Sequence, residues 1–113
     1  MEPITDKRPW GSFEQFTHNE KTTVKIISVN PHQQLSLQYH HHRKEYWKII
    51  SGSAMVQIGD KKVSAMEGDE FIVVEEQRHR ITTEDHPVKI LEISYGDFDE
   101  ADIVRLEDKY GRT

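Results

Sequence analysis

A histidine-rich segment at residues 38–45 carries the side chains of this chain that are best suited to bind a metal ion. Gln38 and His40 are two positions apart, so on a β-strand they project from the same face. Glu45 follows after a short gap and can approach the same point from the next strand, and His79 lies later in the chain. Neutral imidazoles and carboxylates are ligands that divalent ions such as zinc accept. We therefore expect a divalent metal site inside a small β-barrel.

The histidine run leaves other ligand sets open. Strand parity also places His42 inward, so His42 could replace Gln38 as a ligand. A shifted register that uses Tyr39, His41 and Glu45 would offer a neutral phenol in place of the first ligand. The three consecutive histidines could also be a solvated polar run without a function.

Composition restricts the class of the protein and its partners. The chain has 113 residues, which suits one domain, 1–113, with a single core. No apolar run is long enough for a transmembrane span or a signal peptide, and cysteine is absent, so we expect a cytoplasmic protein without a membrane partner. The net charge of −5, with acidic and basic residues interspersed, argues against nucleic acid as the main partner.

Short strand patterns alternate with turn signals along most of the chain. We expect strands at residues 24–29, 35–41, 45–50, 54–58, 62–66, 70–74, 79–83 and 88–95. Turns are expected at residues 30–31, 51–53, 59–60 and 67–69. About eight short strands at regular spacing predict an all-β sandwich or barrel of the jelly-roll type. Near the C-terminus, Ile103 and Leu106 lie three apart among acids, which predicts a short helix over residues 99–110, closed by Gly111.

The spacing of the candidate ligands resembles the first motif of the cupin family. That motif is a glycine, five residues, His-x-His, three or four residues, a glutamate, six residues and a glycine. His32, Gln38, His40, Glu45 and Gly52 follow this spacing. The chain departs from the motif where His32 replaces the first glycine and Gln38 replaces the first ligand histidine. The resemblance implies the cupin double-stranded β-helix, which is a jelly-roll barrel.

A second cupin motif, Gly-x5-Pro-x-Gly-x2-His-x3-Asn, resembles the stretch from Gly68 to Thr83. Here Val74, Glu76 and Thr83 replace the proline, the second glycine and the asparagine, while His79 keeps the ligand position. These replacements affect turn geometry and leave the ligand spacing intact. The resemblance therefore implies that His79 joins the ligands of the first motif.

Residues 35–40 are similar to the metal-binding strand of phosphomannose isomerases, in which a glutamine, a histidine, a glutamate and a later histidine hold zinc. The chain most resembles the C-terminal cupin domain of the bifunctional phosphomannose isomerase/mannose-1-phosphate guanylyltransferases. The motifs that carry this resemblance lie at residues 8–11, 35–45 and 102–112. It implies zinc held by Gln38, His40, Glu45 and His79. The guanylyltransferase activity is not expected here, because the sequence has no glycine-rich nucleotide loop.

The same resemblance implies interconversion of mannose 6-phosphate and fructose 6-phosphate. Two alternatives remain open, a non-catalytic cupin that binds a sugar phosphate or sugar nucleotide, and a different metal-dependent cupin such as an iron dioxygenase. Fold alone does not decide among them, because cupins host many activities. A glutamine among the ligands disfavours the dioxygenase, whose sites usually use more imidazoles.

The substrate phosphate needs cations or hydroxyl donors. Ser36 shares the inward face with Gln38, and the resemblance implies a phosphate contact for its hydroxyl. Arg43 precedes Glu45 by two residues, where the single-function isomerases carry a lysine, so it could bind the phosphate as a charged clamp. Arg105 is a further candidate substrate contact, as are Arg8, Arg78 and Arg80. A general base must also reach the substrate C–H bond. Strand parity offers Lys25 and Glu92 as inward candidates, and the sequence singles out neither.

We expect this chain to associate as a homodimer. A small barrel has sheet edges that must be covered or paired. The aromatic residues Trp10, Phe13 and Phe16 offer a contact for a homodimer, or they line the core of the monomer.

Overall fold

The structure is a computed structural model that describes residues 3–112. Within this range the chain forms ten β-strands and no helix. The strands are β1 (Ile4–Arg8), β2 (Gly11–Gln15), β3 (Thr22–Val29), β4 (Leu37–Tyr39), β5 (Lys44–Ile58), β6 (Lys61–Met66), β7 (Glu70–Val73), β8 (His79–Thr82), β9 (Val88–Tyr95) and β10 (Val104–Glu107). The predicted all-β fold class is therefore confirmed.

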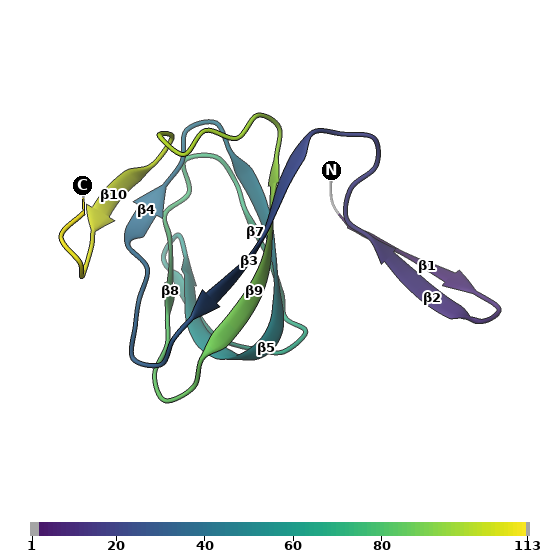
Figure 1. Cartoon of the computed structure of the whole chain (residues 1–113), viewed down its shortest axis with the longest axis horizontal. Helices are drawn as coiled ribbons and strands as arrows, with labels where there is room; N and C mark the ends of the chain where they lie inside the picture. The colour runs from purple at the N-terminus through teal and green to yellow at the C-terminus, as the bar shows by residue number, and fades with distance from the viewer. Residues whose placement is uncertain (1–2, 113) are drawn as a thin grey trace.

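Strands β3 to β10 form a barrel with two walls (Figure 1). One wall has the strand order β3-β9-β5-β7, and the other has the order β10-β4-β8-β5-β6. The long strand β5 belongs to both walls, because its first part pairs with β7 and β9 and its second part pairs with β6 and β8. This arrangement confirms the predicted jelly-roll barrel.

The change of wall within β5 occurs beside Gly52. The register with β9 shifts between Ile49 and Ser51, and Gly52 has a φ of +82°, a conformation that favours glycine. A Cβ atom at this position would lie 2.0 Å from the carbonyl oxygen of Pro87. The turn predicted at residues 51–53 is therefore wrong. The glycine bends one continuous strand, so that the two strands expected at residues 45–50 and 54–58 are one.

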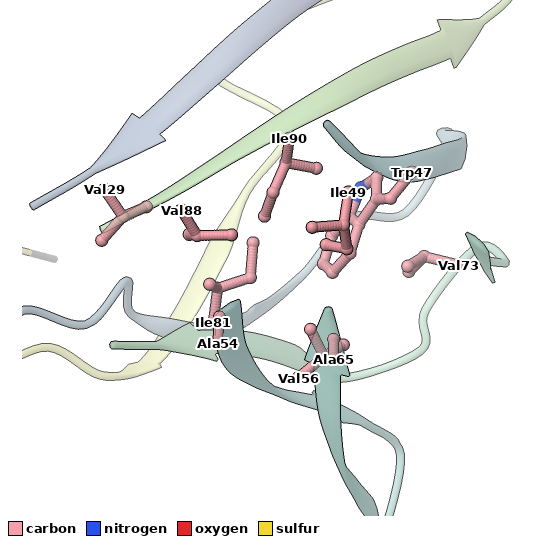
Figure 2. Packing of buried hydrophobic residues seen from close by; sticks show 10 residues of the cluster. All are labelled: Val29, Trp47, Ile49, Ala54, Val56, Ala65, Val73, Ile81, Val88 and Ile90. Carbon is pink, nitrogen blue, oxygen red and sulfur yellow. The ribbon is translucent and has the colours of Figure 1, made fainter. Parts of the chain in front are cut away.

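The hydrophobic core lies between the two walls of the barrel (Figure 2). Trp47 and Ile49 from β5 meet Ile81 from β8 and Ile90 from β9 there, and all four are buried. The remaining buried members of the cluster are Val29, Ala54, Val56, Ala65, Val73 and Val88. Residues on alternate positions of each strand face this core, as the period of a β-strand requires.

The helix predicted at residues 99–110 is wrong. The chain turns at residues 100–101, and β10 then pairs antiparallel with β4, with Val104 opposite Tyr39 and Arg105 opposite Gln38. The β-branched pair Ile103 and Val104 favours an extended chain, and the edge of β4 supplies backbone partners that an isolated short helix in water would lack. Tertiary pairing therefore outweighed a weak helical pattern.

An N-terminal hairpin, β1–β2, was missed by the sequence analysis. It forms a separate two-stranded sheet that projects from the barrel (Figure 1). Trp10 at its turn is 73% exposed, while Phe16, just after the hairpin, packs its ring 5.5 Å from that of Tyr46. Among residues 3–112, no helix with the length and apolar character needed to cross a lipid bilayer is present.

Candidate metal site

A cavity of about 300 Å³ opens between the two walls beside the hydrophobic core. Six of the seven residues predicted to bind metal or substrate line it. They are Gln38, His40, Arg43, Glu45, His79 and Arg105. These six residues therefore share one cavity, although they come from four different strands and the segments beside them.

Three of the predicted metal ligands converge on one point. One ligand atom from each of His40, Glu45 and His79 lies within 4.8 Å of the other two. The three side chains are 4%, 2% and 3% exposed, respectively. His40 follows β4 and His79 begins β8 in one wall, whereas Glu45 lies on β5 in the other wall. The candidate ligands thus face each other across the interior of the barrel.

Both imidazole rings are oriented by backbone carbonyl oxygens. Nδ1 of His40 lies 2.6 Å from the carbonyl oxygen of Asp102, and Nδ1 of His79 lies 3.0 Å from that of Gln77. A carbonyl oxygen only accepts hydrogen bonds, so each ring carries its proton on Nδ1 and presents an unprotonated Nε2. Second hydrogen bonds of this kind are typical of histidines that bind metal.

The histidines are neutral near pH 7. Burial lowers the pKa of His40 to about 4, with a further lowering by the charge of Arg43, although the Asp102 carbonyl acts in the opposite direction. Burial also lowers the pKa of His79 to about 4. Neutral imidazole is the form that coordinates a metal ion, so neither ring needs to lose a proton before binding at this pH.

Glu45 is held from two sides. Its Oε1 accepts a hydrogen bond from Nε1 of Trp47 at 3.0 Å, and its Oε2 lies 3.1 Å from Nε of Arg43. Burial raises the pKa of Glu45, and the Arg43 charge opposes that rise. A guanidinium nitrogen of Arg43 also lies 2.7 Å from Nδ1 and 2.9 Å from Nε2 of His40. With the Nδ1 proton directed at the Asp102 carbonyl, the guanidinium donates to Nε2. A cation therefore already accompanies the candidate ligand atoms, which marks this point as one that favours positive charge.

These residues fit a divalent ion. Two imidazole nitrogens and a carboxylate oxygen converge in a buried setting with oriented rings, a donor set that zinc accepts. Gln38 lines the same cavity and lies opposite His79 in the pairing of β4 with β8. His40, Glu45 and His79 would hold the ion, and Gln38 is the candidate fourth ligand.

The alternative ligands lie elsewhere. His41 and His42 are both exposed and do not line the cavity, because the chain leaves the strand after Tyr39 and the inward parity expected for His42 ends there. Ser36 is 1% exposed, and it too is not part of the cavity wall. A phosphate contact at Ser36 stays a prediction without support from its position.

Two residues of the loop after β9 were missed. The carboxylate of Asp102 accepts the backbone N–H groups of His41 at 2.8 Å and His42 at 3.0 Å. Phe98 lines the cavity, with Nζ of Lys25 4.2 Å and the guanidinium carbon of Arg43 4.5 Å from its ring centroid. Only the resemblance at residues 102–112 pointed toward this region, because the spacing of loop residues carries no periodic signal.

Both inward candidates for a general base line the cavity. Glu92 on β9 is 8% exposed and lies directly opposite Lys25 on β3. Burial, followed by the negative charge of Glu45, raises the pKa of Glu92 to about 7. A carboxyl group with this pKa exchanges protons readily near neutral pH.

Comparison with known proteins identifies relatives of this chain. A family model described as mannose-6-phosphate isomerase C-terminal matches residues 4–108. The alginate biosynthesis protein AlgA of Pseudomonas aeruginosa is 41% identical over 108 residues, which cover 94% of this chain and 22% of AlgA. The mannose-1-phosphate guanylyltransferase ManC of Salmonella typhimurium is 35% identical over 107 residues, which cover 93% of this chain and 22% of ManC. The chain thus spans under a quarter of the length of these relatives.

Solved structures agree on the fold. A protein with a double-stranded β-helix domain from Klebsiella pneumoniae superposes with a TM-score of 0.67 at 21% identity, covering 95% of this chain and 86% of that one. At this identity the likeness shows the fold alone. The family model matches residues 4–108, which is nearly the whole chain. The chain is therefore a cupin that belongs to the mannose-6-phosphate isomerase C-terminal family.

Proposed function

We propose that the protein interconverts mannose 6-phosphate and fructose 6-phosphate with a divalent ion, zinc, held by His40, Glu45, His79 and Gln38. The observation that carries this proposal is the buried convergence of three ligand atoms within 4.8 Å in the wall of a cavity. Membership of the mannose-6-phosphate isomerase C-terminal family supports the choice of reaction.

The reaction requires stabilisation of negative charge. Removal of the proton from the carbon beside a carbonyl group places charge on oxygen, and a bound divalent ion supplies Lewis-acid stabilisation of that charge. His40 and His79 contribute neutral ligands, so the ion would keep a net positive charge beside the single carboxylate of Glu45. The site therefore suits charge that develops during proton transfer.

Cationic side chains support the choice of an anionic substrate. Arg43 and Arg105 line the cavity, and Lys25 lies at its edge with a side chain that is 40% exposed. Guanidinium groups bind phosphate through paired hydrogen bonds. A cavity of about 300 Å³ is near the lower limit for small-molecule sites, which fits one monosaccharide phosphate. We propose Arg43 and Arg105 as its phosphate contacts.

Purified protein tests this function in two steps. Metal analysis should find one zinc per chain, and a coupled assay should detect fructose 6-phosphate formed from mannose 6-phosphate. Gln38→Ala and His79→Ala should abolish turnover, while His86→Ala, at an exposed position, should match the wild type. Binding of the sugar phosphate without turnover would show a non-catalytic binding cupin, and full activity of His79→Ala would refute the metal site.

We also propose that the chain forms a homodimer. An isolated two-stranded hairpin is marginally stable in water. Hairpin β1–β2 projects from the barrel, and the edge strand β3 exposes Val24 by 57% and Ile26 by 62%. A second copy would cover both features. Sedimentation should give twice the chain mass, and Val24→Glu with Ile26→Glu should shift it to the monomer. A wild-type monomer would contradict the proposal.

A further inference from the structure

The wall formed by β3, β9 and β5 arranges its inward residues in rows of directly opposed positions. Three successive rows are Thr23–Ser94–Glu45, Lys25–Glu92–Trp47 and Ile27–Ile90–Ile49. The last of these rows lies at the core, where Ile49 and Ile90 are buried among apolar side chains. The middle row is therefore the boundary between the polar site and the hydrophobic core.

Glu92 lies in this boundary row, one row away from Glu45 and one strand over. On one face of a sheet, such diagonal neighbours are about 7–8 Å apart. Both carboxylates line the same cavity. A small sugar bound beside Glu45 would therefore lie within reach of Glu92, without the need for Glu92 to act as a ligand.

The other acidic residues of the cavity wall are less suited to proton transfer. Among the described residues the wall contains three carboxylates, Glu45, Glu92 and Glu100. Glu45 accepts a hydrogen bond from Trp47, pairs with Arg43 and is one of the three candidate metal ligands. Glu100 has a side chain that is 84% exposed, at the rim, so water competes for it. Glu92 alone of the three combines burial with a place outside the ligand group.

We propose that Glu92 is the catalytic base that moves the proton between carbon 2 and carbon 1 of the sugar phosphate, an inference that rests on the proposed function. The Glu92 carboxylate takes the proton from carbon 2, the C–H electron pair forms the carbon 1–carbon 2 double bond, and the carbonyl pair moves to oxygen 1. Return of that proton to carbon 1, with loss of the oxygen 2 proton and gain of one on oxygen 1, gives the ketose. Atoms and electrons balance without a further reactant.

The test compares Glu92→Gln with Glu67→Gln, the same change at an exposed position outside the cavity. Glu92→Gln should lose about 10²–10⁴-fold in kcat, the range for removal of a general base. Its zinc content and its affinity for fructose 6-phosphate, measured by calorimetry, should stay close to those of the wild type. Glu67→Gln should keep wild-type turnover. Glu92→Asp, which keeps a shorter carboxylate, should recover part of the activity.

A second readout follows the proton itself. In heavy water, part of the protons held by the Glu92 carboxyl exchange with solvent before they return to the sugar. The wild type should therefore place some solvent deuterium on fructose 6-phosphate at carbon 1, and Glu92→Gln should lose this exchange together with turnover. If the wild type is active and Glu92→Gln retains turnover, the proposed role of Glu92 is refuted while the proposed function stands. A zinc-loaded wild type without turnover overturns the proposed function and this inference together. Loss of zinc in Glu92→Gln would assign the residue to the metal site and also overturns the inference.

Discussion

The backbone carbonyl oxygen of Asp102 lies 2.6 Å from Nδ1 of His40, although 62 residues separate the two in sequence. The carboxylate of the same Asp102 receives the N–H groups of His41 and His42. One residue of the loop before β10 thus sets the protonation of a candidate ligand and fixes the backbone that follows it. The loop is part of the support of the site, and its conformation decides where His40 points.

Asp102→Ala should weaken zinc binding by about 10-fold to 100-fold, the usual effect of losing a group that supports metal ligands. The variant keeps the carbonyl group but frees the backbone of His41 and His42. Competition with a chromogenic chelator measures the affinity. Asp97→Ala is the matched control, because the Asp97 carboxylate in the same loop pairs with Lys21 at the surface. Equal zinc affinity in both variants would show that the carboxylate does not support the site.

Acid should destabilise the metal-free protein through its two buried histidines. Their pKa values are about 4 when folded, against 6.5 ordinarily, so the unfolded chain binds protons first as pH falls. The contribution of the two neutral rings to the free energy of unfolding is complete above pH 6.5 and is lost as pH falls toward 4. The loss is on the order of 3 kcal/mol for each ring. Glu92, with a pKa raised to about 7, acts in the opposite direction.

Because Glu92 acts against the two histidines, the measurement compares histidine variants with the wild type. Urea unfolding with a chelator at about pH 7.5 and about pH 4.5 gives the pH dependence of the free energy of unfolding. His79→Gln should lose less stability between these two values than the wild type does. His86→Gln, at an exposed position, should follow the wild type. An unchanged dependence in His79→Gln would mean that this ring is not neutral in the folded protein.

Much of the candidate site could be predicted because its candidate ligands lie on strands or, for His40, directly after one, where alternation still fixes direction. Gln38, His40 and Glu45 were identified from spacing, and His79 required the cupin resemblance. Strand parity does not hold for His42, because β4 ends at Tyr39 and alternation does not extend into a turn. The contacts of Asp102 depend on how a loop folds back, which no local pattern encodes.

The fold was predicted in outline for a similar reason. Strands with a buried face, such as β9, show clear alternation or apolar character. The N-terminal hairpin has no buried face of its own in the chain, so it gave no such signal. The sequence predicts a turn at Gly52, because glycine marks both turns and strand bends, and only the close approach of Pro87 distinguishes them.

Arg43→Met should destabilise the metal-free protein by roughly 3–5 kcal/mol, the range for removing one partner of a buried ion pair. The variant leaves the buried Glu45 carboxylate without the cation that lies 3.1 Å away. Added zinc should restore most of the melting temperature, because the ion supplies the missing positive charge. Arg78→Met, which breaks an exposed pair with Asp60, should change stability by less than about 1 kcal/mol. Equal melting temperatures of the two variants without zinc would contradict the pairing.

Gly52→Ala should destabilise the protein by more than about 1 kcal/mol, because the added Cβ collides with Pro87 and the positive φ disfavours alanine. Chemical unfolding measures the change. Gly111→Ala is the control, since a Cβ there meets no atom within 4 Å although its φ is also positive. A smaller loss for Gly52→Ala than for Gly111→Ala would show that the close approach to Pro87 has no energetic weight.

The two histidines and the glutamate of the site belong to opposite walls of the barrel. An ion bound to all three would link chain segments that meet only in the folded state, as a disulfide does in proteins that contain cysteine, which this chain lacks. Separation of the walls would then require the coordination bonds to break first. The holoprotein should for this reason unfold more slowly than the apoprotein, and its lifetime would depend on the supply of metal.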